Sequence, residues 1–135
     1  MPGNSDKSEA RCSRLKQRRE FLLARRLGRK WVRPGMVVQA RPHQKQLDGE
    51  LHSLSVRLGF TVSKKVGNAV RRNRVKRRLR AVAEQVLPEN VRPGFDIVMI
   101  GRATTATRSF ECLVNDLKQA LKKLKVFRDV ALSKD

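Results

Sequence analysis

The 135-residue sequence has few acidic residues, only two cysteines and no long apolar run. No stretch approaches the roughly 18 consecutive apolar residues that indicate a membrane-spanning helix. The N-terminal residues also lack the apolar segment of a secretory signal. Cys12 and Cys112 lie far apart and belong to no CxxC or Cys/His cluster, so we expect neither a disulfide framework nor a zinc site. These absences predict a protein of the reducing cytoplasm with no role at a membrane.

The sequence also lacks the pattern of a catalytic site. Its 12 acidic residues are scattered without a close pair in a polar motif, and no Ser/His or Cys/His arrangement is present. His43 and His52 flank a polar stretch, and we interpret both as solvated loop residues. We therefore expect no catalytic residue and no metal ligand in this chain. If hydrolysis is involved, another molecule supplies the chemistry.

Positive charge is what the sequence has in excess. The chain has 32 lysines and arginines against 12 acidic residues, which gives a formal net charge of +20 at pH 7. Such a field concentrates phosphate groups near the protein and speeds association with them. Residues 11–33 and 64–80 together hold 19 of the 32 cations. Nucleic acid is the expected partner.

Segment 64–80, KKVGNAVRRNRVKRRLR, carries nine cations and no acid around an apolar stripe. Val75, Leu79, Val82 and Val86 recur at the spacing of one helix face, which predicts a packed helix and not a disordered tail. The cations must cover the rest of the helix surface, where such crowding is self-repelling unless a polyanion faces it. Arginine outnumbers lysine on this helix, which favours bidentate contacts with phosphates or base edges.

Two local features leave alternatives open. The turn at residues 64–68 precedes a helix N-terminus, where free amides and Gly67 either hold a phosphate or only connect a strand to the helix. Phe21 and Trp31 lie among cations, so each ring either stacks on the bases of a single strand or belongs to the core.

The pattern of elements predicts one α+β domain in which helices pack on a small sheet. Alternating apolar and polar residues predict a strand over 54–63, which Gly59 either bulges or divides. The polar residues 1–13 are expected to form a disordered tail. Further strands are expected at 36–40 and 96–100, with helices from the N-cap Ser13 to Leu27, from the N-cap Asn68 to Pro88, and from the N-cap Ser109 to Lys125.

The run FTVSKKVGNAVRRNRVKRRLR, residues 60–80, closely resembles the signature of the bacterial ribonuclease P protein component. The RNR element of that signature stands here as Arg72, Asn73 and Arg74. The upstream RLKQRREF resembles the opening helix of the family, and DIVMIGR followed by SFECLVNDL resembles its end. The resemblance covers residues 14–125.

The resemblance implies a two-layer sandwich with the element order αβββαβα, of the ribosomal protein S5 domain 2-like type. It also implies a left-handed crossover through the helix that carries the RNR element, although about 98% of such crossovers are right-handed. We accordingly expect a folded domain at residues 14–126, preceded by the tail at 1–13 and followed by a C-terminal tail at 127–135.

The resemblance implies a function as well. A protein of this family joins a catalytic RNA to form an endonuclease that removes the 5′ leader from precursor tRNA. The RNA holds the Mg²⁺ ions and performs the cleavage, so no cofactor is expected on the protein alone. The rival hypothesis is a structural ribosomal or chaperone-like RNA-binding protein without a role in tRNA processing. A stand-alone nuclease is a third hypothesis, and we expect no cleavage by the protein alone.

Two sets of residues carry over from the family motif. In place of aromatic residues that the family often has in its cleft, this chain has Arg25 and Gln39, so we expect leader binding to depend more on charge and hydrogen bonding. The predicted leader cleft consists of Arg18, Phe21, Arg25, Val37 and Gln39. The predicted contacts to the catalytic RNA are Lys64, Lys65, Arg71, Arg72, Asn73, Arg74, Lys76, Arg77, Arg78 and Arg80.

Overall fold

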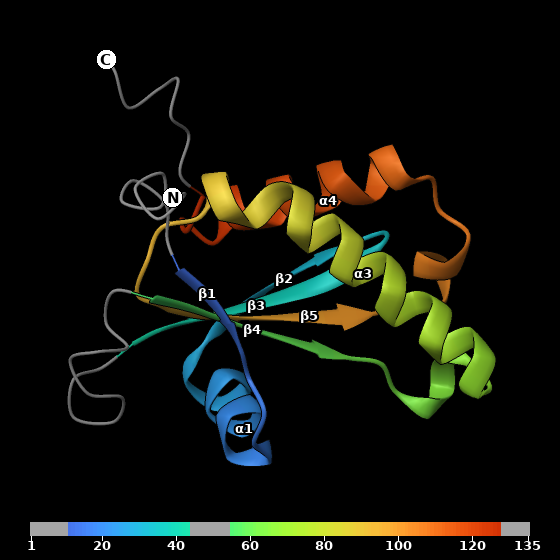
Figure 1. The fold of residues 1–135 in the computed structure, drawn as a ribbon, viewed down its shortest axis with the longest axis horizontal. Coiled ribbons are helices and arrows are strands. Elements are labelled where there is room, and N and C mark those ends of the chain that lie inside the picture. Colours follow the sequence, from blue (N-terminus) through green and yellow to red (C-terminus); the bar gives the residue numbers. More distant parts are fainter. Residues whose placement is uncertain (1–10, 44–54, 128–135) are drawn as a thin grey trace, which may run out of the picture.

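The computed structural model describes residues 11–43 and 55–127, which form a five-stranded sheet with the strand order β1-β4-β5-β3-β2. Figure 1 shows helix α1 on one side of this sheet and helices α3 and α4 on the other. The elements in chain order are β1 (Arg11–Arg14), α1 (Arg18–Leu27), β2 (Arg29–Arg33), β3 (Met36–Pro42), β4 (Ser55–Thr61), the 3-10 turn η3 (Lys64–Val66), α3 (Ala69–Asn90), β5 (Phe95–Gly101), the 3-10 turn η4 (Ala103–Ala106) and α4 (Phe110–Lys123).

The main core lies between the sheet and the pair α3 and α4. Val75, Leu79, Val82 and Val86 of α3 are all fully buried there, as their spacing predicts. The strands contribute alternate residues, among them Val38 of β3, because successive side chains of a strand point to opposite faces. The opposite face of the sheet is covered only in part, by α1 and residues packed against it. The predicted α+β class is confirmed.

The sheet is mixed. Neighbouring strands β4 and β5 are parallel and are connected through α3, whereas β3 pairs with β5 and β2 with β3 in antiparallel fashion. This connection is the crossover to which the resemblance assigns a left hand. The order αβββαβα is present from α1 onward, with β2, β3 and β4 as its three strands.

The N-terminal part differs from the prediction. Residues 11–13 belong to strand β1, which runs parallel to β4 at the edge of the sheet, so the tail predicted at 1–13 is too long. Ser13 is part of this strand and does not cap a helix. Helix α1 begins instead at Arg18, after the N-cap Gln17. Strand β2 was not predicted, because the edge strand RKWVR is largely exposed and shows no apolar alternation.

The structure differs from the prediction at Gly59, at the end of α3 and at the end of the domain. Strand β4 runs unbroken through Gly59, which is neither a bulge nor a break. A Cβ atom on Gly59 would lie 2.5 Å from the ring of Phe21, so the glycine makes room for that ring. Helix α3 continues two residues past Pro88, so this proline does not end the helix. Phe127 pairs with Val91 in an isolated bridge, one residue beyond the predicted domain end.

Candidate nucleic-acid interface

Helix α3 begins where the sequence predicts. The Asn68 side chain accepts a hydrogen bond from the backbone N–H of Arg71 at 2.9 Å, which satisfies one of the free amides of the first turn. Gly67 precedes it at φ 150°, a backbone angle in the region that favours glycine. The start of α3 is therefore fixed locally, and this fixes the angular position of every cation that follows.

The lysines and arginines of α3 have no acidic partner within the described residues. Every ion pair among the described residues involves Asp96, Asp116 or Glu20, and none involves a cation of α3. The apolar stripe faces the core, so these cations must occupy the remaining surface of the helix. This arrangement leaves a dense positive surface that no carboxylate of the described residues neutralises.

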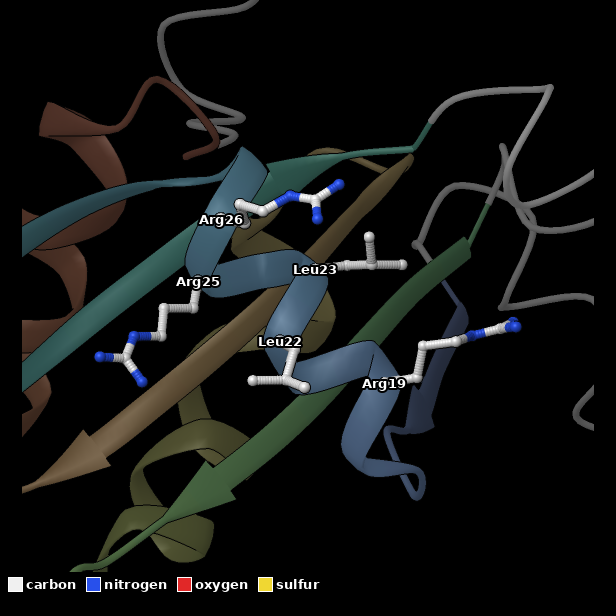
Figure 2. Close-up of a pocket in the computed structure, with 5 residues that line it drawn as sticks. All are labelled: Arg19, Leu22, Leu23, Arg25 and Arg26. Atoms are coloured by element: carbon white, nitrogen blue, oxygen red, sulfur yellow. The ribbon is translucent and has the colours of Figure 1, made fainter.

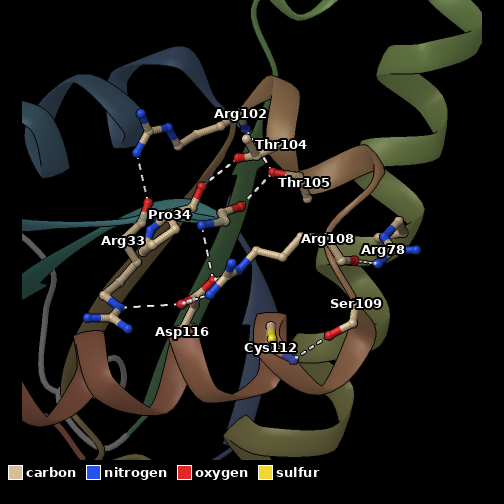
Figure 3. Close-up of polar contacts among 11 residues, drawn as sticks. Arg33, Pro34, Arg78, Arg102, Thr104, Thr105, Arg108, Ser109, Cys112 and Asp116 are labelled. Atoms are coloured by element: carbon tan, nitrogen blue, oxygen red, sulfur yellow. Dashed lines mark hydrogen bonds and ion pairs between the residues drawn. The ribbon is translucent and has the colours of Figure 1, made fainter.

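The ten residues predicted to contact RNA fall into two groups. Four arginines donate to backbone carbonyls of the chain: Arg71 to Ala103, Arg72 to Gly67, Arg74 to Ala106 and Arg78 to Arg108, and Figure 3 shows the last of these. These bonds orient the guanidinium groups without neutralising them. The other six side chains are exposed and have no hydrogen-bond or ion-pair partner among the described residues: Lys64, Lys65, Asn73, Lys76, Arg77 and Arg80.

Three of these four carbonyls, those of Ala103, Ala106 and Arg108, lie on a segment held in place by Asp116 and its surroundings (Figure 3). Asp116 of α4 is fully buried and accepts hydrogen bonds from Arg108 Nε at 2.7 Å, Gly35 N at 3.0 Å and Arg33 Nε at 3.3 Å. The hydrogen bond to Asp116 raises the pKa of Arg108, which keeps it charged. Thr105 also donates to the Gly35 carbonyl, at 2.6 Å. Residues 102–108 are thus tied to the β2–β3 turn and to α4.

A cleft of about 460 Å³ lies on the other face of the sheet, between α1 and strands β2 to β5. It brings together all five residues predicted for the leader cleft. The strand register places the floor residues of the cleft side by side, because Val37 of β3 pairs with Ile100 of β5 and Gln39 pairs with Val98. The full lining is Arg18, Phe21, Leu22, Arg25, Lys30, Val37, Gln39, Thr61, Val98 and Ile100.

Five lining residues are absent from the prediction, and Lys30 is the charged one among them. It lies on β2 opposite Gln39 of β3, so recognising β2 as a strand would have placed it beside the predicted set. Trp31, the next residue, does not line this cleft. Trp31 is 39% exposed, and the Lys123 ammonium lies over its ring, 5.6 Å from the centroid.

Helix α1 presents different side chains on its two sides. Figure 2 shows Arg25 on one side of the helix and Arg19 and Arg26 on the other. Phe21 is partly buried against the sheet and packs on a small core with Leu15. A second hollow, of about 580 Å³, lies along α1 at Leu22 and Leu23 and is bordered by arginines.

A buried ion network holds the sheet beneath α1. Asp96 of β5 is fully buried and lies beside Arg41 of β3 and Arg57 of β4 in the strand register. Its carboxylate accepts from Arg41 Nη2 at 2.8 Å and from Arg57 Nε at 2.7 Å, and His43 Nε2 lies 2.7 Å away. Burial alone would raise the pKa of Asp96, but the hydrogen bonds from His43, Arg57 and Arg41 outweigh it and lower the pKa.

The interpretation of His43 as a solvated loop residue was wrong. Its side chain is 1% exposed, because the residue follows β3 directly and its ring reaches the carboxylate of Asp96. His52 lies outside the described residues.

The same network attaches α1 to the sheet. Arg57 Nη1 donates to Glu20 Oε2 of α1 at 3.2 Å, while Glu20 Oε1 accepts from the backbone N–H groups of Lys16 and Gln17, each at 2.9 Å. Burial would raise the pKa of Glu20, but these two backbone bonds and the charge of Arg57 together lower it. Glu20 therefore caps α1 and fixes its N-terminal end above β4.

Comparison with known families identifies this arrangement. Residues 10–125, most of the chain, match the family model described as Ribonuclease P. The chain belongs to the ribonuclease P protein family. Two curated relatives are the ribonuclease P protein components of Paramagnetospirillum magneticum and Ruegeria pomeroyi. The first is 48% identical over 85% of this chain and 84% of the relative, and the second 52% identical over 82% and 84%.

Solved structures of ribonuclease P proteins share the fold. A mutant of the Staphylococcus aureus RNase P protein with defective mRNA degradation activity aligns with a TM-score of 0.67 at 32% identity, over 84% of this chain and 89% of that one. The RNase P protein of Thermotoga maritima aligns with a TM-score of 0.60 at 32% identity, over 84% and 96%. The family resemblance inferred from residues 60–80 is confirmed.

In this member of the family, the two predicted residue sets occupy opposite faces of the sheet. The RNA-contact set lies on and before α3, and the leader set lines the cleft beside α1. Within residues 11–43 and 55–127, no group of three His, Cys, Asp or Glu residues could hold a metal ion. No helix of that part of the chain is long and apolar enough to cross a membrane.

Proposed function

We propose that this chain is the protein subunit of ribonuclease P, which binds the catalytic RNA and the 5′ leader of precursor tRNA and so promotes removal of the leader. The observation that carries the proposal is the outer face of α3, where the cations meet no carboxylate of the described chain. Relatives named as ribonuclease P protein components support it.

The catalytic RNA is the partner that fits α3. Phosphates supply a counter-charge that no described carboxylate provides, and a guanidinium that donates one N–H to a carbonyl keeps others for a phosphate oxygen. Arg74, for example, donates through Nε to Ala106, which leaves both terminal nitrogens for the RNA. The carbonyl-bound arginines therefore serve as oriented contacts beside Arg77 and Arg80, whose side chains pair with no described residue.

The cleft beside α1 fits a single-stranded leader. Arg18, Arg25 and Lys30 can neutralise successive phosphates, while Phe21 and the apolar floor receive bases. Phe21 is the only aromatic residue in the described lining, so charge and the amide of Gln39 carry more of the binding than stacking does. We place this activity in the cytoplasm, and we assign the cleavage and its Mg²⁺ ions to the RNA subunit.

Reconstitution tests the function. Purified protein is added to a bacterial ribonuclease P RNA and a precursor tRNA at low Mg²⁺, and leader removal is measured. We expect strong stimulation by the protein and no cleavage by the protein alone. Tight RNA binding without stimulation would favour a ribosomal or chaperone-like RNA-binding protein, and cleavage without the RNA would favour a stand-alone nuclease.

A matched pair of variants tests the cleft. Arg25→Ala removes a cation that lines it, whereas Arg19→Ala removes a cation of the same helix that does not (Figure 2). We expect R25A to weaken holoenzyme binding of precursor tRNA by about two- to tenfold and to leave binding of leaderless tRNA unchanged. R19A should change neither. Equal effects of both variants would place the leader elsewhere.

A further inference from the structure

A smaller pocket lies on the α3 side of the sheet, between β1, β4 and α3. Its volume is about 180 Å³, and it opens between the strand edge and the last cations of the helix. The buried part of its lining is apolar, and the exposed part is polar. The apolar lining comprises Leu58, Phe60, Ala83 and Leu87, and the polar lining comprises Ser13, Arg14, Arg80 and Glu84.

This pocket has the features of a site for a nucleic-acid base. The guanidinium carbon of Arg14 lies 4.9 Å from the ring centroid of Phe60, and that ring is only partly buried. Unstacked RNA bases bind on aromatic rings and on guanidinium planes of this kind. Arg80 belongs both to the pocket and to the unpartnered cations of α3, so the pocket is continuous with the surface proposed to bind the RNA.

Attraction between the cations of α3 and RNA phosphates does not explain why a carboxylate, that of Glu84, lies in this pocket. Glu84 is exposed and lies one helical turn beyond Arg80, and its carboxylate makes no hydrogen bond or ion pair with any described residue. A carboxylate on a phosphate-binding surface weakens binding by repulsion. Its position is explained if it accepts hydrogen bonds from a bound base.

We propose that this pocket binds one unpaired guanine of the partner RNA. Guanine presents N1–H and N2–H as adjacent donors, which match the two oxygens of the Glu84 carboxylate, whereas the other bases place an acceptor beside each donor. The base ring contacts Phe60 and Arg14, and Arg80 meets the phosphate. This inference rests on the proposed function, because it requires RNA along α3.

A charge-matched pair of variants separates base recognition from electrostatics. Glu84→Gln and Glu111→Gln each remove one exposed carboxylate, but Glu111 lies on α4 outside the pocket. If charge alone acts, both variants bind bacterial ribonuclease P RNA slightly more tightly than the unmodified protein. If Glu84 reads guanine, E84Q binds about tenfold more weakly while E111Q does not. Equal or tighter binding by E84Q overturns the proposal.

Kethoxal, which modifies the N1 and N2 atoms of unpaired guanine, identifies the base. We expect one guanine of the RNA to be protected by the unmodified protein and to become reactive again with E84Q and with Phe60→Leu, which keeps apolar packing but loses the ring. Absence of any such guanine overturns the proposal. If the unmodified protein fails to bind the RNA, the proposed function fails too. If it binds the RNA and the pocket variants bind and protect it equally well, only the proposal for this pocket is wrong.

Discussion

The network beneath α1 and the outer face of α3 use the same guanidinium group in opposite ways. Arg41 and Arg57 lie buried beside Asp96, which accepts hydrogen bonds from both. Arg77 and Arg80 are exposed, and no described carboxylate pairs with them. A buried cation must be matched within the chain, because its lost hydration is otherwise uncompensated, whereas an exposed cation stays hydrated until a partner arrives. Pairing, more than the amount of charge, distinguishes structural arginines from binding arginines.

Removal of Asp96 should produce the largest effect. Asp96→Ala leaves Arg41 and Arg57 in a buried site without their shared carboxylate, and breaking a buried pair in this way costs about 3–5 kcal/mol. Urea denaturation measures the loss. The exposed Glu111→Gln serves as control and should stay within about 0.5 kcal/mol of the unmodified protein. A loss below about 1 kcal/mol for D96A would mean that the network is not needed to hold the strands.

Removal of Asp116 should lower the free energy of unfolding by less than removal of Asp96, and it should also weaken RNA binding at α3. Asp116→Ala leaves the buried N–H of Gly35 without its acceptor, a loss of about 1–3 kcal/mol, whereas Arg33 and Arg108 are partly exposed and recover hydration. Because residues 103–108 also accept hydrogen bonds from three arginines of α3, RNA affinity should fall although Asp116 lies away from that surface. Unchanged RNA affinity in a destabilised D116A would show that these carbonyls do not orient the arginines.

Arg77 and Arg78 are neighbours on α3, and they test the difference between an exposed arginine and one bonded within the chain. Arg77→Ala should leave the free energy of unfolding within about 0.5 kcal/mol, because that side chain has no partner among the described residues. Log affinity for RNA falls as log salt rises, and R77A should make this negative slope less steep by about 0.7–0.9, the value for one phosphate contact. Arg78→Ala should cost about 1 kcal/mol of stability, since the Arg108 carbonyl loses its donor. Equal stability losses in R77A and R78A would mean that the carbonyl-bound arginine contributes no more to the fold than the exposed one.

The sequence predicts the α3 surface better than the rest because its signal is local. The stripe from Val75 to Val86 defines the buried face, and every cation between follows from helical geometry. Asn68 and Ser109 also cap their helices as predicted, since capping depends on residues three positions apart.

The cleft and the network were less predictable because they depend on contacts between distant strands. Arg41, Arg57 and Asp96 meet only through the register of three strands, and nothing near any of them in the sequence specifies that register. Edge strands β1 and β2 carry exposed charged residues, so they lack the alternation that reveals a half-buried strand. Lys30 was missed for this reason, whereas the five predicted cleft residues came from the family resemblance.

The smallest effect concerns the carboxylate that joins α1 to the network. The pKa of Glu20 in the folded protein is lowered from its ordinary value of 4.5, so the ionised group stabilises the fold above that value and the contribution is lost as the pH falls through the lowered pKa. Glu20→Gln should therefore be about 0.5–1 kcal/mol less stable at pH 7, with the difference closing at lower pH because both side chains are then neutral. Urea denaturation from pH 7 to pH 3 measures it. A constant difference across this range would mean that Glu20 acts through packing and that its charge does not hold α1 on the sheet.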